Sequence, residues 1–197
     1  MDMNEIKLNV IVMADKACEI MNLIEDGFIK NKMDFLTVAM QEEGEINRME
    51  RVLTDSIMAI AKSSADKREL SALSQIVEML ERIGDEATGL VERIEVKVHE
   101  KLLFKEDAVK EFNETYSTAK ASVRMMREYL RSKDAGLKEE IVNNSLRVKE
   151  LVERYRTEHA DRLVRGDCTP MEANMYFDML DFTGNIARHS SSIAKLG

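Results

Sequence analysis

Leu80-Glu81-Arg82-Ile83-Gly84-Asp85-Glu86-Ala87 decides the fold class, because it lies in a long segment whose apolar residues recur at three-to-four spacing. This spacing is typical of an α-helix with one buried stripe. Two carboxylates four residues apart, Glu81 and Asp85, then project from one side of the helix, with roughly 6 Å between their Cβ atoms. They fall outside the apolar stripe and are close enough to share a cation.

The same apolar period recurs in six segments of nearly thirty residues each, which predicts six long helices. Short breaks separate the segments, at 31–32, 63–66, 104–105, 133–136 and 166–168. The break at 63–66 contains a capping-box-like pair, Asp66 and Glu69, that predicts the start of the third helix. Gly136 is expected to end the fourth helix. Thr169 as N-cap, followed by Pro170 and by Glu172, predicts the start of the sixth helix.

Three segments before the break near Phe104 and three of similar length after it indicate an internal repeat. A shift of 103 positions places the apolar residues of the third segment on those of the sixth. A helix about 45 Å long, at 1.5 Å per residue, cannot bury its stripe alone. We therefore expect an all-α fold of two tandem three-helix bundles that pack together, with a first repeat at 1–104 and a second at 105–197.

Composition agrees with a helical protein and narrows the function classes. The chain has one Pro, no Trp and 34% charged residues, which leaves little sequence for strands. A formal net charge of -8 opposes nucleic-acid binding, because that needs a concentrated Lys/Arg face.

The sequence also predicts a cellular setting. The longest apolar run near the N-terminus, Val10 to Ala14, is far short of the roughly 18 residues that span a bilayer, so at most peripheral membrane contact is expected. Only two cysteines, Cys18 and Cys168, and the absence of a signal-peptide pattern favour the cytoplasm. Cys18 lies in a periodic helix and is expected to be a small packing residue.

Several motifs together resemble the PhoU-type phosphate-uptake regulators. The run from Glu81 to Ala87 is similar to their Glu-Arg-Ile-Gly-Asp-His-Ala helix signature. The remaining similar stretches, which look most like the PhoU domains attached to sodium/phosphate cotransporters, are 102–112, 155–168, 176–180, 186–189 and 193–194. Those domains follow a membrane region, and this chain has none, so it resembles either a free-standing homologue or a domain cut from a longer protein.

The resemblance implies a metal site on the surface of the first bundle. Two acidic motifs, one on the second and one on the third helix, hold metal ions in that family. Here they read as Glu43 with Asn47, and Glu81 with Asp85. Carboxylate and amide oxygens suit Mg²⁺, Mn²⁺ or iron, and Zn²⁺ is a further candidate. Acids four apart are also common on ordinary solvated helix faces, so that interpretation stays open.

The second half departs from this pattern. A shift of 103 sets Gly184 and Arg188 where the first half has Glu81 and Asp85, while Ser145 and Lys149, at a shift of 102, replace Glu43 and Asn47. Two cations at these positions would repel a metal ion. Two alternatives remain: in a register of 100, Asp181 and Asn185 form a weaker second metal site, and in the preferred register the two basic residues attract an anion such as phosphate.

Three function classes follow. The resemblance implies a non-catalytic regulatory adaptor in phosphate homeostasis, with a phosphate transporter, a sensor kinase or both as partners and a homodimer as a further expectation. A carboxylate di-iron enzyme would need Glu-x-x-His pairs, but Val96, Arg156 and Ile186 stand three residues before the three histidines. The third class is a metal-free helical scaffold that binds another helix along a groove. The sequence favours the adaptor.

Overall fold

The computed structural model describes residues 1–62 and 67–197, which form six α-helices and no strand. The helices are α1 Met3–Lys30, α2 Met33–Ala61, α3 Lys67–His99, α4 Glu106–Ser132, α5 Ala135–Val164 and α6 Pro170–Leu196. This confirms the all-α prediction. The predicted capping box at Asp66 lies outside the described residues. None of the described helices combines the length and the apolar content needed to cross a membrane.

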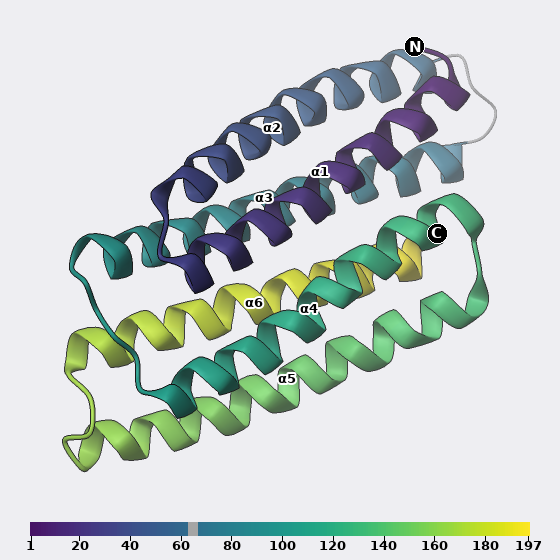
Figure 1. Cartoon of the computed structure of the whole chain (residues 1–197). Helices are drawn as coiled ribbons and strands as arrows, with labels where there is room; N and C mark the ends of the chain where they lie inside the picture. Colours follow the sequence, from purple (N-terminus) through teal and green to yellow (C-terminus); the bar gives the residue numbers. More distant parts are fainter. Residues whose placement is uncertain (63–66) are drawn as a thin grey trace.

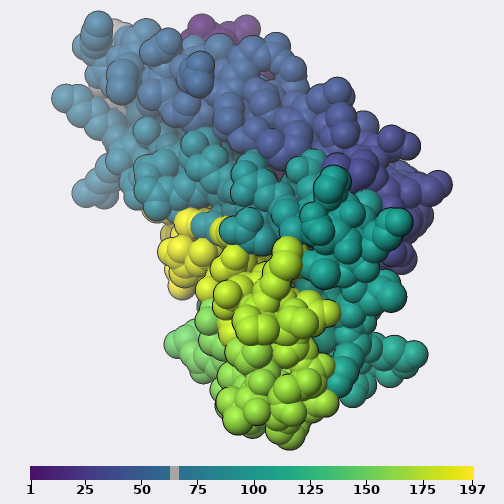
Figure 2. Space-filling view, turned by 90° about the vertical axis from the view of Figure 1, so that its left-hand side faces the viewer, coloured from purple at the N-terminus to yellow at the C-terminus, as the bar shows by residue number. Residues whose placement is uncertain are grey.

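The helices form two stacked three-helix bundles (Figure 1). Helices α1, α2 and α3 pack on one another, and so do α4, α5 and α6. The bundles meet through α3 on α6 and α1 on α4, so that α2 and α5 lie on opposite outer sides. The end-on view of Figure 2 shows the two bundles as separate lobes joined along this seam. The residues 100–105 connect them, and the division into repeats at 104 and 105 stays a prediction.

Two of the predicted helix ends have different outcomes. The capping box at the start of α6 is confirmed, because the Glu172 amide donates to Thr169 Oγ1 over 3.2 Å and the Thr169 amide donates to Glu172 Oε2 over 2.7 Å. The prediction that Gly136 ends α4 is wrong. Helix α4 ends at Ser132, and Lys133 adopts the left-handed cap with φ 56°. Gly136 belongs to the first turn of α5, because Asp134 caps that helix by accepting the Gly136 amide over 2.7 Å.

Burial is compatible with the 103-position register of the repeat and equally with a register of 100, in which Ile76, Ile83 and Leu90 fall on the buried Tyr176, Thr183 and Ser190. Along α3, the residues Ile76, Ile83 and Leu90 are almost fully buried. Their counterparts on α6 in the register of 103 are Met179, Ile186 and Ile193, which are also fully buried. Each long helix thus presents one continuous apolar stripe to its own bundle, as the helical period requires.

The contact between α3 and α6 depends on a glycine. A Cβ atom built on Gly89 of α3 would lie 2.5 Å from Cζ of Phe182 on α6, well inside van der Waals contact. The missing side chain therefore lets the Phe182 ring lie directly on the α3 backbone. This close approach constrains how α3 and α6 pack against each other.

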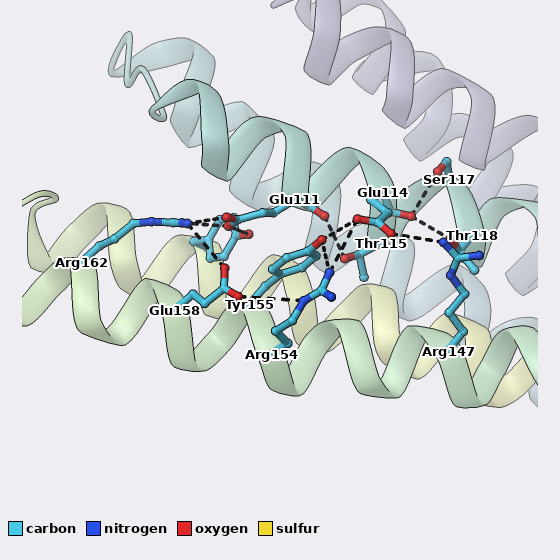
Figure 3. Close-up of polar contacts among 11 residues, drawn as sticks. Glu111, Glu114, Thr115, Ser117, Thr118, Arg147, Arg154, Tyr155, Glu158 and Arg162 are labelled. Carbon is cyan, nitrogen blue, oxygen red and sulfur yellow. Dashed lines mark hydrogen bonds and ion pairs between the residues drawn. The ribbon is translucent and has the colours of Figure 1, made fainter.

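Ionic contacts hold α5 to α4, because α5 buries few apolar side chains (Figure 3). Arg162 pairs with Glu111, with both side chains mostly buried, and Tyr176 of α6 donates to the same carboxylate over 3.1 Å. Further along, Glu114 accepts from the Tyr155 hydroxyl and from Arg147. These donors stabilise the ionised carboxylate and lower the pKa of Glu114, with the Tyr155 hydrogen bond as the largest cause.

The glycine contact generates a stability prediction. Gly89→Ala should lower the free energy of unfolding by about 1–3 kcal/mol, because the added methyl overpacks the Phe182 ring. Gly44 is the matched control, since it also lies within a helix but an added Cβ would meet nothing within 4 Å. Gly44→Ala should raise the free energy of unfolding by about 0.5–1 kcal/mol through helix propensity alone.

Urea denaturation followed by circular dichroism measures both variants. The double variant Gly89→Ala with Phe182→Leu should recover part of the loss, because the smaller side chain leaves room for the methyl. Equal stabilisation by the two alanine substitutions would show that Gly89 carries no packing constraint.

Candidate metal site on the first bundle

The predicted site residues lie on two adjacent helices, with Glu43 and Asn47 on α2 and Glu81 and Asp85 on α3. Each pair is separated by one helical turn. The helices are in contact at this point, since a Cβ built on Gly84 would lie 3.6 Å from Cγ of Glu43, an ordinary van der Waals distance. The two pairs therefore flank the same close contact between α2 and α3.

On α2, Glu43 and Asn47 satisfy part of each other's hydrogen-bonding capacity. Glu43 is buried, with 8% of its surface exposed, and its Oε1 accepts a hydrogen bond from Asn47 Nδ2 over 2.7 Å. This fixes the orientation of the amide and leaves Asn47 Oδ1 buried without a donor among the described residues. A buried acceptor without a partner is costly, and a cation or a bound water would satisfy it.

On α3, Glu81 is half-buried and Asp85 is exposed, as the position outside the apolar stripe predicts. The two side chains lie one helical turn apart on α3. Burial, the adjacent charge of Asp85 and the charge of Glu50 all raise the pKa of Glu81 above its ordinary value, with burial as the largest cause. Glu81 thus holds a proton more tightly than an isolated glutamic acid, and a cation could take the place of that proton.

Glu50 on α2 is an acidic residue near this candidate site that the sequence analysis did not predict. Its charge raises the pKa of Glu81 across the helix contact, so it borders the same acidic region. A signal was available, because Glu50 follows Glu43 by seven residues and therefore lies on the same side of α2.

The residues present fit a hard cation, although they do not form a closed coordination shell. Carboxylates and an amide oxygen are the donors that Mg²⁺ and Mn²⁺ prefer. Over residues 1–62 and 67–197, however, no three His, Cys, Asp or Glu side chains converge into a group that could hold a metal ion. The four residues form two pairs on neighbouring helices, and Asn47 Oδ1 is a buried acceptor without a donor among the described residues.

The alternative second metal site is disfavoured by its contacts. Asp181 forms an ion pair with Arg156, and Asn185 donates to Glu86 over 3.2 Å. Both ligands are thus engaged with other partners, and Arg188 donates to Asn185 Oδ1 over 3.2 Å as well. A cation here would compete with two arginines.

The remaining candidate side chains are structural. Cys18 donates to the Val123 carbonyl, and burial raises the pKa of its thiol to about 11, which agrees with a packing role. His159 is buried and stacks on Tyr176 with 4.1 Å between ring centroids. Burial and the nearby Arg162 lower the pKa of His159. His189 is also buried, 3.8 Å from Glu86.

The raised pKa of Glu81 predicts that the effect of substituting this residue on stability depends on pH. Because the pKa of Glu81 is raised on folding, its contribution to stability is fully present below the pKa of the unfolded chain and is lost as the pH rises through the folded-state value. In metal-free buffer, Glu81→Gln should therefore stabilise the protein at neutral pH and have little effect at about pH 3.5.

Chemical denaturation midpoints at the two pH values measure this difference. Glu92→Gln, an exposed position on the same helix, is the control and should change the midpoint little at either pH. A Glu81→Gln variant that is less stable than the wild type at neutral pH would contradict a raised pKa of Glu81 in the folded protein.

Comparison with known proteins agrees with these observations. Residues 10–94 match the PhoU domain, and no curated protein sequence matches the chain. In structure, the chain is similar to PhoU from Pseudomonas aeruginosa, with a TM-score of 0.92 and 18% identity over 98% of this chain and 93% of that one. It is also similar to the phosphate transport system regulatory protein PhoU from Streptococcus pneumoniae, with a TM-score of 0.85 and 10% identity over 98% of this chain and 91% of that one. The chain thus contains a match to the PhoU domain at residues 10–94 and has the fold of these PhoU structures over nearly its whole length.

Proposed function

We propose that this chain is a non-catalytic regulatory adaptor in phosphate homeostasis, which acts in the cytoplasm by contacting a phosphate transporter, its sensor kinase or both. The observation that carries the proposal is the PhoU domain together with a PhoU fold over nearly the whole chain. The Streptococcus pneumoniae protein of the same fold is a phosphate transport system regulatory protein. Because the fold alone does not fix a function, the proposal needs a cellular test.

Exposed apolar side chains support an output through protein contacts. Leu8 and Val12 lie one turn apart on α1, with 63% and 45% of their surfaces exposed. Val52 and Met58 on α2 are 51% and 61% exposed. Apolar surface of this kind on an acidic protein suits a partner protein or a second copy of the chain.

The second part of the proposal is a cation held by Glu43, Asn47, Glu81 and Asp85. Magnesium, manganese, iron and zinc are the candidate metals. When bound, the cation would offset the repulsion between the acids with its positive charge. It would also provide a partner for the Asn47 oxygen, which has no donor among the described residues. The residues themselves would clamp α2 to α3, because each helix contributes one pair.

The alternative is a metal-free helical scaffold. It is favoured by one observation, the lack of three converging acidic or histidine side chains in the described parts of the chain. In that case Glu81 and Asp85 form part of a solvated face, and binding to a partner would not depend on them.

Phosphate uptake in a deletion strain tests the adaptor. Cells that lack the gene should accumulate radiolabelled phosphate when phosphate is plentiful, since the restraint on the transporter is lost. Unchanged uptake and unchanged phosphate-responsive expression, in a strain without a redundant homologue, would refute the regulatory assignment and leave the scaffold ahead.

Complementation with the double variant Glu81→Ala and Asp85→Ala tests the metal. The purified variant should remain folded but lose divalent metal by elemental analysis, because both side chains lie outside the core. If metal is part of the signal, this variant behaves like the deletion. The variant Glu139→Ala with Glu140→Ala removes the same charge from an exposed part of α5 and should keep both metal and regulation. Equal metal content in the two double variants would mean that the site is wrongly placed.

A further inference from the structure

The second bundle has a hollow at the positions that correspond to the candidate metal site of the first bundle. It lies between α5 and α6 and measures about 440 Å³. The side chains that line it are Ser145, Leu146, Lys149, Val152, Asp181, Gly184, Asn185 and Arg188. Helices α5 and α6 pack on each other as α2 and α3 do, so the hollow and the acidic region are related by the internal repeat.

The charge at these positions is inverted between the two halves. The first bundle has four carboxylates and one amide at the candidate site, which are Glu43, Asn47, Glu50, Glu81 and Asp85. A shift of 102 between α2 and α5 puts Ser145, Lys149 and Val152 in the places of the first three. A shift of 103 between α3 and α6 puts Gly184 and Arg188 in the places of Glu81 and Asp85, whereas a shift of 100 puts Asp181 and Asn185 there. In either register at most one of the four acids is retained, and two cations, Lys149 and Arg188, line the hollow. This lining opposes a cation and attracts an anion.

Small residues line the hollow between α5 and α6. Glu43 is replaced by the much smaller Ser145. Gly184 also lines the hollow and extends no side chain into it, and an added Cβ there would make an ordinary contact of 3.5 Å with Val152.

The one acidic residue that lines the hollow is Asp181, and its charge is offset by an arginine. Asp181 is paired with Arg156, whose guanidinium also lies over the Phe177 ring. Lys149 has only a loose contact with Glu153, at 3.8 Å with both side chains largely exposed, and such pairs hold little energy. Arg188 donates one hydrogen bond, from Nη2 to Asn185 Oδ1, and its guanidinium group has further N–H donors.

We propose that this hollow binds a tetrahedral oxyanion, as free inorganic phosphate or as the phosphate group of a small monoester. The Lys149 ammonium and the Arg188 guanidinium approach from opposite helices, and the Ser145 hydroxyl adds a neutral donor. Guanidinium groups match the spacing of phosphate oxygens, and charge-assisted hydrogen bonds are the strong ones. This site is separate from the adaptor role, and its assay gives a result whether or not the chain regulates uptake.

Lys149 gives the cleaner test of the two cations. Arg188 also lines the neighbouring hollow that contains Glu81 and Asp85, so changing it would disturb both regions. Lys110 on α4 is a closely matched control. Its side chain is 73% exposed against 72% for Lys149, and it contacts Glu106 at 3.9 Å with the same four-residue spacing.

Isothermal titration calorimetry on full-length, metal-free protein should detect binding of inorganic phosphate. We expect Lys149→Gln to weaken it about tenfold, the effect of losing one charge-assisted contact, and Lys110→Gln to leave it unchanged. Gly184→Glu should abolish it, because the carboxylate fills the hollow and repels the anion. Circular dichroism verifies that each variant is folded.

A parallel titration with glycerol 3-phosphate identifies the source of the anion. Tighter binding of phosphate supports a free-ion site, and tighter binding of the monoester supports a site for a phosphorylated metabolite. The proposal is overturned if neither ligand gives saturable binding, or if Lys149→Gln and Gly184→Glu bind phosphate as well as the Lys110→Gln control.

Discussion

The seating of the Phe182 ring on the backbone of α3 at Gly89 is the contact on which the arrangement of the two bundles depends. It sets α6 close against α3, and the polar contacts of that seam follow from it, since His189 and Asn185 both reach Glu86. The same seating brings Arg188 to the edge of the acidic region on α3. The candidate cation site and the cationic hollow therefore lie on either side of one rigid interface.

The fold was predictable because it depends on apolar period and on helix ends, which are local properties of the sequence. The Thr169 capping box shows this, whereas Gly136 shows the limit: the side chain of Asp134 decided which helix the glycine joined. The pairing of Glu81 with Asp85 was likewise local. The burial of Glu43, the orphaned oxygen of Asn47 and the influence of Glu50 depend on how α2 lies on α3, and such contacts between helices cannot be derived from the spacing along one helix.

The internal repeat gives a physical interpretation of the difference between the halves. Two bundles of the same architecture keep their buried stripes in register, because the packing of each long helix constrains those positions. At the positions of the candidate metal site, in contrast, the two halves have side chains of different charge. Acidic side chains that repel one another lie on the first bundle, and shorter or basic side chains lie on the second. Sites of opposite charge can thus coexist on one scaffold.

The central claim is that the first bundle holds a cation and the second does not. It is tested most directly by a crystal structure grown with Mn²⁺ in phosphate-free buffer and measured for anomalous scattering. The account predicts an anomalous peak beside Glu81 and Asp85, within reach of Asn47 Oδ1, and no peak beside Lys149 and Arg188. A peak in the second bundle, or none in the first at saturating Mn²⁺, would contradict it.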